Sequence, residues 1–152
     1  MKYFKTLELG EKVELVDYVI QKLVENKHIK IYIGTDSQNY GGFTHYATCV
    51  VLRYNQRGGH VLYNKVKVPR IRDHWTRLWK ECELSVEAAN WLSDNSSIKV
   101  EFLELDYNTV KITESHKLVS ATRGWVESLG YKCRLKPDEM IACKAADFIC
   151  RK

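Results

Sequence analysis

The sequence lacks an apolar run of the length that a membrane-spanning helix needs, which is about 20 residues. Its first residues, MKYFKTLELGEKVEL, are charged early and do not include the apolar core of a secretory signal peptide. Membrane-spanning and secreted proteins are therefore not expected classes. We predict a cytoplasmic protein that has no membrane partner.

Closely spaced cysteines are also missing. The five cysteines form no C-x-x-C motif, and an odd number without close pairs argues against a disulfide framework and a structural zinc site. Cys143 and Cys150 are seven residues apart and can share one face of a helix. We expect the cysteines to be buried free thiols, because a free cysteine behaves as a small hydrophobic residue.

Proline occurs only twice, as Pro69 and Pro137, and both lie at apparent boundaries of secondary structure. No repeat, low-complexity tract or proline-rich linker divides the 152 residues, of which 45% are hydrophobic. A chain of this length and composition can form one domain with a substantial core. We predict a single domain over 1–152, in which residues 1–27 are an N-terminal helical extension.

Hydrophobic periodicity predicts the order of the helices and strands. Apolar residues at helical spacing predict a helix over 9–26, with a packing face made of Val13, Val16, Ile20 and Leu23. Strands are predicted over 29–36, 44–55, 61–68, 99–108 and 131–136, and further helices over 75–92 and 114–130. Pro137 and Asp138 are expected to open a final helix, with Asp138 as its N-cap.

The predicted elements can form only a few sheets. The first three strands should pair as antiparallel hairpins, because the glycine-containing segments between them are typical of tight turns. Helical crossovers then make the first, fourth and fifth strands parallel. We predict an α/β (mixed α+β) fold with a five-stranded mixed sheet in the order 3-2-1-4-5, flanked by helices.

Two aspartates follow strands that should be neighbours in this sheet. Asp36 comes after the apolar run IYIGT and before a glycine-rich loop, and Asp106 comes at the end of KVEFLELD. Ligands bind at the carboxyl ends of parallel strands in open α/β sheets. Asp36 and Asp106 are therefore expected to lie close together.

Helices supply further acidic candidates. Asp147 lies in the nearly all-apolar segment MIACKAADFICRK, although a local ion pair with Lys144 or Arg151 would also explain it. Glu81 and Glu83 lie on opposite flanks of the apolar stripe of helix 75–92, and periodicity does not choose between them. Clustered carboxylates need cations, and oxygen ligands favour Mg²⁺ or Mn²⁺.

The net charge of +5 permits nucleic-acid binding, and basic residues are concentrated in KVKVPRIRDHWTRLWK, residues 65–80. Lys67, Arg70 and Arg72 are candidates for phosphate contacts, and Trp75 and Trp79 for base stacking. A helix that buries both tryptophans is the alternative interpretation. No nucleotide-binding P-loop and no G-x-S-x-G elbow is present, so the sequence does not favour nucleotide hydrolysis or serine-hydrolase chemistry.

Four stretches resemble the ribonuclease H-like superfamily and, more narrowly, the bacterial and phage YkuK-like family: IYIGTDSQ, TRLWKECELSVEAANWL, ELDYN and RGWVESLGYKCRLKPDEMIACKAAD. The resemblance implies that the catalytic residues and metal ligands are Asp36, Glu81, Asp106 and Asp147. It selects Glu81 over Glu83 because the family's helix reads E-x-x-x-S, as it does here with Ser85. Lys144 stands one turn before Asp147, where it could contact a phosphate.

The resemblance implies a Mg²⁺- or Mn²⁺-dependent nuclease that cleaves RNA, an RNA–DNA hybrid or structured DNA. A non-catalytic nucleic-acid-binding module with the same fold is the alternative, and a protein-interaction domain is a third hypothesis. All four acidic residues favour the nuclease, whereas Lys144 and the absence of a histidine between Cys133 and Asp138 favour the binding module. The oligomeric state does not follow from the sequence.

Overall fold

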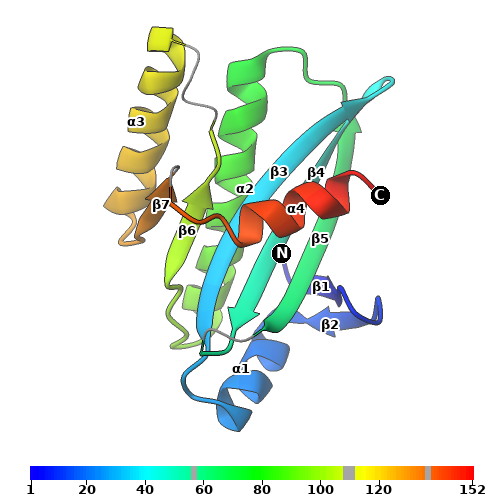
Figure 1. The fold of residues 1–152 in the computed structure, drawn as a ribbon, viewed down its shortest axis with the longest axis vertical. Helices are drawn as coiled ribbons and strands as arrows, with labels where there is room; N and C mark the ends of the chain where they lie inside the picture. Colours follow the sequence, from blue (N-terminus) through cyan, green and yellow to red (C-terminus); the bar gives the residue numbers. More distant parts are fainter. Residues whose placement is uncertain (56–57, 108–111, 136–137) are drawn as a thin grey trace.

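One mixed sheet with helices on both faces forms the framework of the protein (Figure 1). The structure is a computed structural model that describes residues 1–55, 58–107, 112–135 and 138–152. Its strands are β1 (Tyr3–Thr6), β2 (Lys12–Glu14), β3 (Lys30–Tyr40), β4 (Phe43–Arg53), β5 (Gly59–Pro69), β6 (Phe102–Leu105) and β7 (Cys133–Leu135). Its helices are α1 (Leu15–Glu25), α2 (His74–Asn95), α3 (Ile112–Ser128) and α4 (Ala142–Cys150).

The strand order is β2-β1-β5-β4-β3-β6-β7. The last five strands of this order are the five predicted strands in the predicted arrangement. β4 is antiparallel to β3 and β5, whereas β6 and β7 continue the sheet in parallel with β3. The predicted mixed α/β fold is therefore confirmed, with two further strands at the β5 edge.

The N-terminal segment differs from its prediction. Residues 12–14 pair with β1 as strand β2, so the helix predicted over 9–26 begins only at Leu15. The Glu14 carboxylate accepts hydrogen bonds from the backbone N–H groups of Val16 and Asp17 and caps the helix. The predicted packing face is partly wrong, because Leu15 and Val19 are buried together with Val16, while Ile20 is exposed.

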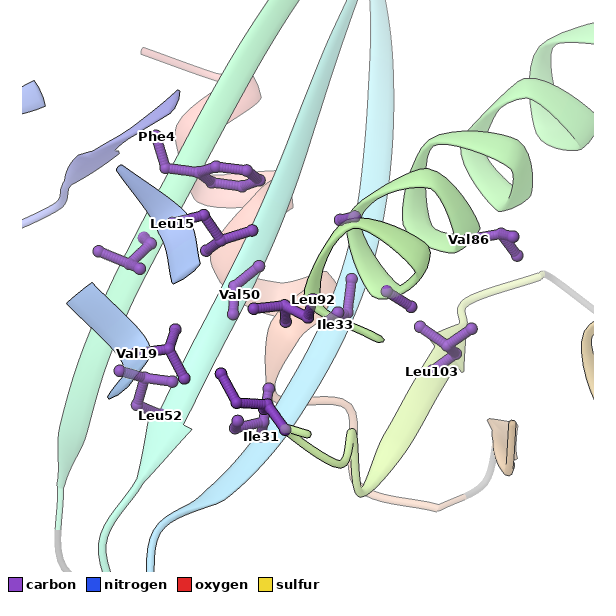
Figure 2. Close-up of a cluster of buried hydrophobic side chains, with 14 of the residues drawn as sticks. Phe4, Leu15, Val19, Ile31, Ile33, Val50, Leu52, Val86, Leu92 and Leu103 are labelled. Atoms are coloured by element: carbon purple, nitrogen blue, oxygen red, sulfur yellow. The ribbon is translucent and has the colours of Figure 1, made fainter. Parts of the chain in front are cut away.

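The main core lies between the sheet and α1 and α2. Ile31 and Ile33 of β3 point to this side, and Leu92 of α2 packs against them (Figure 2). Alternating residues of a strand face opposite sides of a sheet, so this face is set by the apolar alternation of the IYI segment. Among the described residues, no helix combines the length and apolar character that crossing a membrane requires.

Helix α4 covers the opposite face and crosses β3, β4 and β5 (Figure 1). The crossing depends on Gly34, because a Cβ atom there would lie 2.7 Å from the Cys143 Sγ and 2.8 Å from the Cys143 backbone nitrogen. Cys143 and Cys150 are buried on this face, and all five cysteines are free, as expected from the sequence. The glycine of the IYIGTD segment thus lets α4 approach the strand that carries Asp36.

Candidate active site

Asp36 lies within a strand, and its predicted position at a strand end is wrong. β3 continues to Tyr40, and Asp36 is paired with Ala47 of β4. The continuation exists because the two-residue turn at Gly41 and Gly42 lets β3 and β4 pair along their whole length, with Gly41 at a φ of 54°. The sequence suggested a loop at this point because residues 37–42 are polar and rich in glycine.

The neighbouring strand nevertheless ends beside Asp36, as predicted. β6 pairs in parallel with β3, and its last paired residue on this side is Glu104, opposite Gly34. Asp106 directly follows β6, two residues after Glu104, just as Asp36 lies two residues after Gly34 on β3. The prediction that Asp36 and Asp106 come from adjacent parallel strands is confirmed.

Helix α4 brings Asp147 to the same region, but its N-terminus is not built as predicted. The backbone N–H of Asp138 donates to the carbonyl of Leu135 in a turn, and the predicted cap at Asp138 is wrong. Pro137 lies outside the described residues. The Glu104 carboxylate caps α4 instead and accepts the backbone N–H groups of Ile141, Ala142 and Cys143 at 3.0, 2.7 and 3.0 Å.

The carboxyl groups of Asp36 and Asp147 lie close enough for each to shift the pKa of the other. The Gln38 amide donates to Asp147 Oδ1 at 3.3 Å, and Arg151 Nε donates to the same oxygen at 2.8 Å. The local ion pair considered for Asp147 is therefore present, and it coexists with the contact to Asp36. Gln38 thus faces α4, and Asp36 faces the same way because residues two apart on a strand lie on one face of the sheet.

This pairing shifts the two pKa values in opposite directions. Burial, and then the neighbouring Asp147 carboxyl, raise the pKa of Asp36 to about 6. Burial alone would raise the pKa of Asp147 too, but hydrogen bonds from Arg151 and Asp36 outweigh it and lower the pKa. A proton on Asp36, or a divalent cation bound by both carboxyl groups, would therefore relieve the repulsion between Asp36 and Asp147.

Glu81 is the helix α2 carboxylate that faces the sheet. Its exposed fraction is 5%, whereas Glu83 is only partly buried and forms an ion pair with Lys80. The Ser37 hydroxyl donates to Glu81 Oε2 at 2.6 Å. Helical periodicity did not show which of Glu81 and Glu83 faces the sheet, and the packing of α2 against β3 shows that it is Glu81.

The charge of Glu81 is unfavourable in this position. Burial raises its pKa well above the ordinary range; the Ser37 hydrogen bond opposes the shift, and the charges of Asp36 and Asp106 add to it. Glu81 and Asp106 also line one small interior space, which is too narrow for a water molecule. The four predicted carboxylates are thus electrostatically linked, although they reach β3 from both of its faces.

The carboxylates do not form a closed metal site in this geometry. Within the described residues, no three or more His, Cys, Asp or Glu side chains are arranged to hold a metal ion. The Asp36–Asp147 pair fits one hard cation in its chemistry, because its ligand atoms would be the carboxylate oxygens of two neighbouring side chains. A second position would require the Glu81 side chain to leave Ser37 and approach Asp36.

The predicted phosphate contacts are all exposed, but the basic stretch is divided by the fold. Lys67 ends up on β5, where its ammonium lies 3.9 Å from the ring centroid of Phe43. Trp79 stacks on Trp125 of α3 with the ring centroids 5.9 Å apart, so it serves packing between helices. The aromatic residue beside Lys67 is consequently not one of the two tryptophans.

The other basic candidates are placed as follows. The Arg70 guanidinium donates to the carbonyl of Gly41 at 2.7 Å, which ties the end of β5 to the β3–β4 turn. Arg72 precedes α2 and is exposed. Lys144 is exposed on α4, three residues before Asp147.

Three polar residues of this region were not identified from the sequence: Ser37, Gln38 and Glu104. The segment TDSQ contains a signal for the first two, since alternation in a strand turns Ser37 and Gln38 to opposite faces beside Asp36. Glu104 had a weaker signal, a carboxylate two residues before Asp106 inside an apolar strand. Burial of such a group requires hydrogen-bond partners, and α4 provides them.

Comparison with protein families agrees with this geometry. The ribonuclease H-like family model matches residues 12–151. The chain therefore belongs to the ribonuclease H-like family. A comparison with curated proteins finds no match.

Proposed function

We propose that this protein is a divalent-metal-dependent nuclease that cleaves phosphodiester bonds in RNA, an RNA–DNA hybrid or structured DNA. The observation that carries the proposal is that two carboxyl groups, Asp36 on β3 and Asp147 on α4, are neighbours. Gln38, two residues along β3, donates to Asp147 at 3.3 Å, and each carboxyl group shifts the pKa of the other. Like charges avoid such contact unless a proton or a cation lies between them. Membership of the ribonuclease H-like family supports an activity related to nucleic acid.

The four carboxylates have distinct roles in this proposal. Asp36 and Asp147 would hold one Mg²⁺ or Mn²⁺ ion, and Asp36, Glu81 and Asp106 would hold a second. Bound ions of this kind activate the attacking water and stabilise the leaving oxygen of a phosphodiester. Arg151 and Gln38 would orient Asp147, since both already donate hydrogen bonds to Oδ1.

A non-catalytic nucleic-acid-binding module is the second candidate. It is favoured by the Ser37–Glu81 hydrogen bond and the Arg151–Asp147 ion pair, which engage two of the four carboxylates without metal. The exposed Lys144, three residues before Asp147, would then contact phosphate. Membership of the narrower YkuK-like family and a cytoplasmic location remain predictions from the sequence.

The substitution Asp36→Asn tests the nuclease directly. We expect it to abolish Mn²⁺-dependent cleavage of labelled single-stranded RNA, RNA–DNA hybrid and branched DNA, because the amide loses the charge that two ions would share. We also expect Mn²⁺ to raise the thermal stability of the wild type more than that of the variant, by mass action on the native state. The exposed Asp94 of α2 provides the matched control, Asp94→Asn.

Two results would contradict the proposal. Equal cleavage by the wild type and Asp36→Asn would show that the activity arises elsewhere. An equal response of their melting temperatures to Mn²⁺ would mean that Asp36 holds no ion. Binding of nucleic acid without cleavage or metal response would favour the non-catalytic module.

A further inference from the structure

The β3–β4 hairpin extends beyond α4 and presents side chains next to the carboxylates (Figure 1). Residues directly opposite each other in antiparallel strands share a face. The face on the α4 side continues from Asp36 to Gln38 and Tyr40, and we call its outer part the hairpin face. It consists of Gln38, Tyr40, Phe43, His45 and Lys67, which are cross-strand neighbours of one another.

The two sides of this hairpin are unlike. On the far side, Asn39 donates to the carbonyl of Ile71, and the hydroxyl of the buried Thr44 accepts the backbone N–H of Ile71. On the hairpin face, by contrast, Tyr40 and Phe43 are 48% and 43% exposed. The exposed rings therefore lie on a hairpin that the other side already anchors.

The rings are held in place by their neighbours. Tyr40 meets the His45 ring edge-to-face with the centroids 5.6 Å apart, and the Lys67 ammonium lies over Phe43. The exposed Lys65 is two residues before Lys67 on β5, on the same face of the sheet. It pairs with Ala47, the residue that pairs with Asp36, so it lies nearer to the carboxylates. Aromatic rings beside cations are the combination that binds bases by stacking and the backbone by charge.

The hairpin face is continuous with the carboxylates. Gln38, in the middle of it, donates a hydrogen bond to Asp147. Tyr40 is four residues beyond Asp36, which corresponds to about 13 Å along an extended strand. A strand of nucleic acid can cover this distance with a few nucleotides, so one strand could reach both places.

We propose that the hairpin face binds an unpaired nucleic-acid strand, with bases stacked on Tyr40 and Phe43 and phosphates near Lys65 and Lys67. This inference rests on the proposed function and narrows its substrate class. A strand is favoured over a duplex because a paired base hides its ring face inside the helical stack. Positive charge beside the rings favours nucleic acid over an apolar protein segment.

The double substitution Tyr40→Leu/Phe43→Leu tests the proposal. It retains apolar side chains but removes the ring faces, and both sites are exposed, so the fold should be retained. Tyr3→Leu is the matched control, because Tyr3 is 46% exposed and also lies under two lysine ammonium groups, but on β1, between β2 and β5 and away from the hairpin face. Binding is measured by fluorescence anisotropy in EDTA, with single-stranded DNA, single-stranded RNA and a duplex of the same sequence.

We expect the double variant to bind both single strands about tenfold more weakly or worse, since each stacked base contributes substantially. Duplex binding by the double variant and all binding by Tyr3→Leu should change less than twofold. Unchanged single-strand binding, an equal loss for the duplex, or a wild type that binds neither form would overturn the proposal. The last outcome would favour a protein as the occupant of the face.

The test is separable from that of the nuclease. EDTA removes divalent ions, so binding to the hairpin face is measured without metal or cleavage. If the wild type cleaves nothing but the double variant binds single strands more weakly than the wild type, the hairpin face is supported and the nuclease is contradicted. Unchanged binding together with Asp36-dependent cleavage would overturn only the hairpin face.

Discussion

Asp36 is the residue at which strand position, burial and charge act together. It stands on the central strand β3, beside the end of β6 and under the C-terminal half of α4. Burial and Asp147 raise its pKa to about 6, above the ordinary value of 3.8. A carboxylate placed this way destabilises the metal-free protein whenever it is ionised.

The raised pKa predicts a pH dependence of stability without metal. The folded state binds the Asp36 proton more tightly than the unfolded state, so the stabilisation is complete below about pH 4 and is lost as the pH rises through about 6. Relative to Asp36→Asn, the wild type should therefore lose on the order of 1 kcal/mol of unfolding free energy across this range, after allowance for partial exposure. Urea unfolding in EDTA at a series of pH values measures the difference.

Asp94→Asn serves as the control for this experiment, because Asp94 is exposed at the far end of α2. Its unfolding free energy should follow that of the wild type at every pH. The lowered pKa of Asp147 makes the protein more stable as the pH rises, which is the opposite effect. That change in stability falls below about pH 3.8, the ordinary pKa of an aspartate, and so outside the pH range measured. Parallel curves for the wild type and Asp36→Asn would show that Asp36 does not titrate with a raised pKa.

At the level of elements, α4 depends on another strand for its start. Ile141 precedes the helix and offers no side-chain cap. The Glu104 carboxylate on β6 takes three of the orphan backbone N–H groups, while Gly34 on β3 lets the helix lie close to the sheet. The position of Asp147 is therefore set by two strands that are far from it in the sequence.

The cap predicts the effect of Glu104→Gln at neutral pH. A glutamine offers one carbonyl oxygen to the three N–H groups and turns a donor towards them, so unfolding free energy should fall by about 1–3 kcal/mol. Burial raises the pKa of Glu104 and outweighs the three backbone hydrogen bonds, which lower it. The loss of unfolding free energy in Glu104→Gln should therefore be smaller at acid pH, where Glu104 of the wild type is protonated. Chemical denaturation measures both values.

Glu101→Gln is the matched control, because Glu101 is partly exposed and only three residues earlier. Its unfolding free energy should change by less than about 0.5 kcal/mol. If Asp147 is a metal ligand, Glu104→Gln should also reduce the stabilisation by Mn²⁺, since the helix that holds Asp147 loses its anchor. A Glu104→Gln protein as stable as the wild type would contradict the capping role.

For the whole molecule, the distribution of charge matters more than the net charge of +5. The acidic residues Asp36, Glu81 and Asp106 are near enough for their charges to raise the pKa of Glu81, and Asp147 in turn raises that of Asp36. Lys67, Arg70 and Arg72 are exposed around the outer ends of β3, β4 and β5. A phosphate backbone attracted to these cations would approach the carboxylates, and divalent ions would offset the repulsion there.

This distribution predicts how nucleic-acid affinity depends on salt. The logarithm of the association constant should fall linearly with the logarithm of salt concentration, by roughly 0.7 per neutralised phosphate for a single strand and 0.9 for duplex DNA. Charge reversal of Lys67, Arg70 and Arg72 should flatten this slope, by about 1 for each phosphate contact that is lost. Anisotropy titrations at several salt concentrations measure the slope.

Lys99→Glu is the control, because Lys99 is exposed in the segment between α2 and β6. It should weaken binding through net charge with little change in slope. An equal flattening by Lys99→Glu would indicate nonspecific attraction to the whole protein, and salt-independent binding would favour the protein-interaction hypothesis. Arg70 also donates to Gly41, so Arg70→Glu needs a check of thermal stability.

Much of the fold was predictable because it depends on short-range patterns. The alternation of Ile31 and Ile33 with less apolar residues predicts a strand with one face in the core. The paired glycines at 41–42 predict a tight hairpin, and Gly130, with a φ of 90°, follows the end of α3 as expected. The order of hairpins and helical crossovers then limits the sheet to the strand order that is observed.

The candidate site was predictable only in part. Parallel crossovers bring Asp36 and Asp106 to adjacent strands, and that follows from topology alone. Resemblance to a family, and not periodicity, selected Glu81 over Glu83. The contact between Asp36 and Asp147 could not be predicted, because it depends on how closely α4 lies on β3.

The sequence by itself thus determined which residues are apolar at which period, where the turns fall, and that Asp36 and Asp106 come from adjacent parallel strands. The tertiary structure decided which flank of a helix meets the sheet, so that Glu81 is buried while Ile20 is exposed. It also decided that Glu104 caps α4 and that Phe43, not a tryptophan, lies beside Lys67. The physical reason is that hydrophobic periodicity and turn preference are local, whereas burial, capping and charge pairing depend on segments that are distant in sequence.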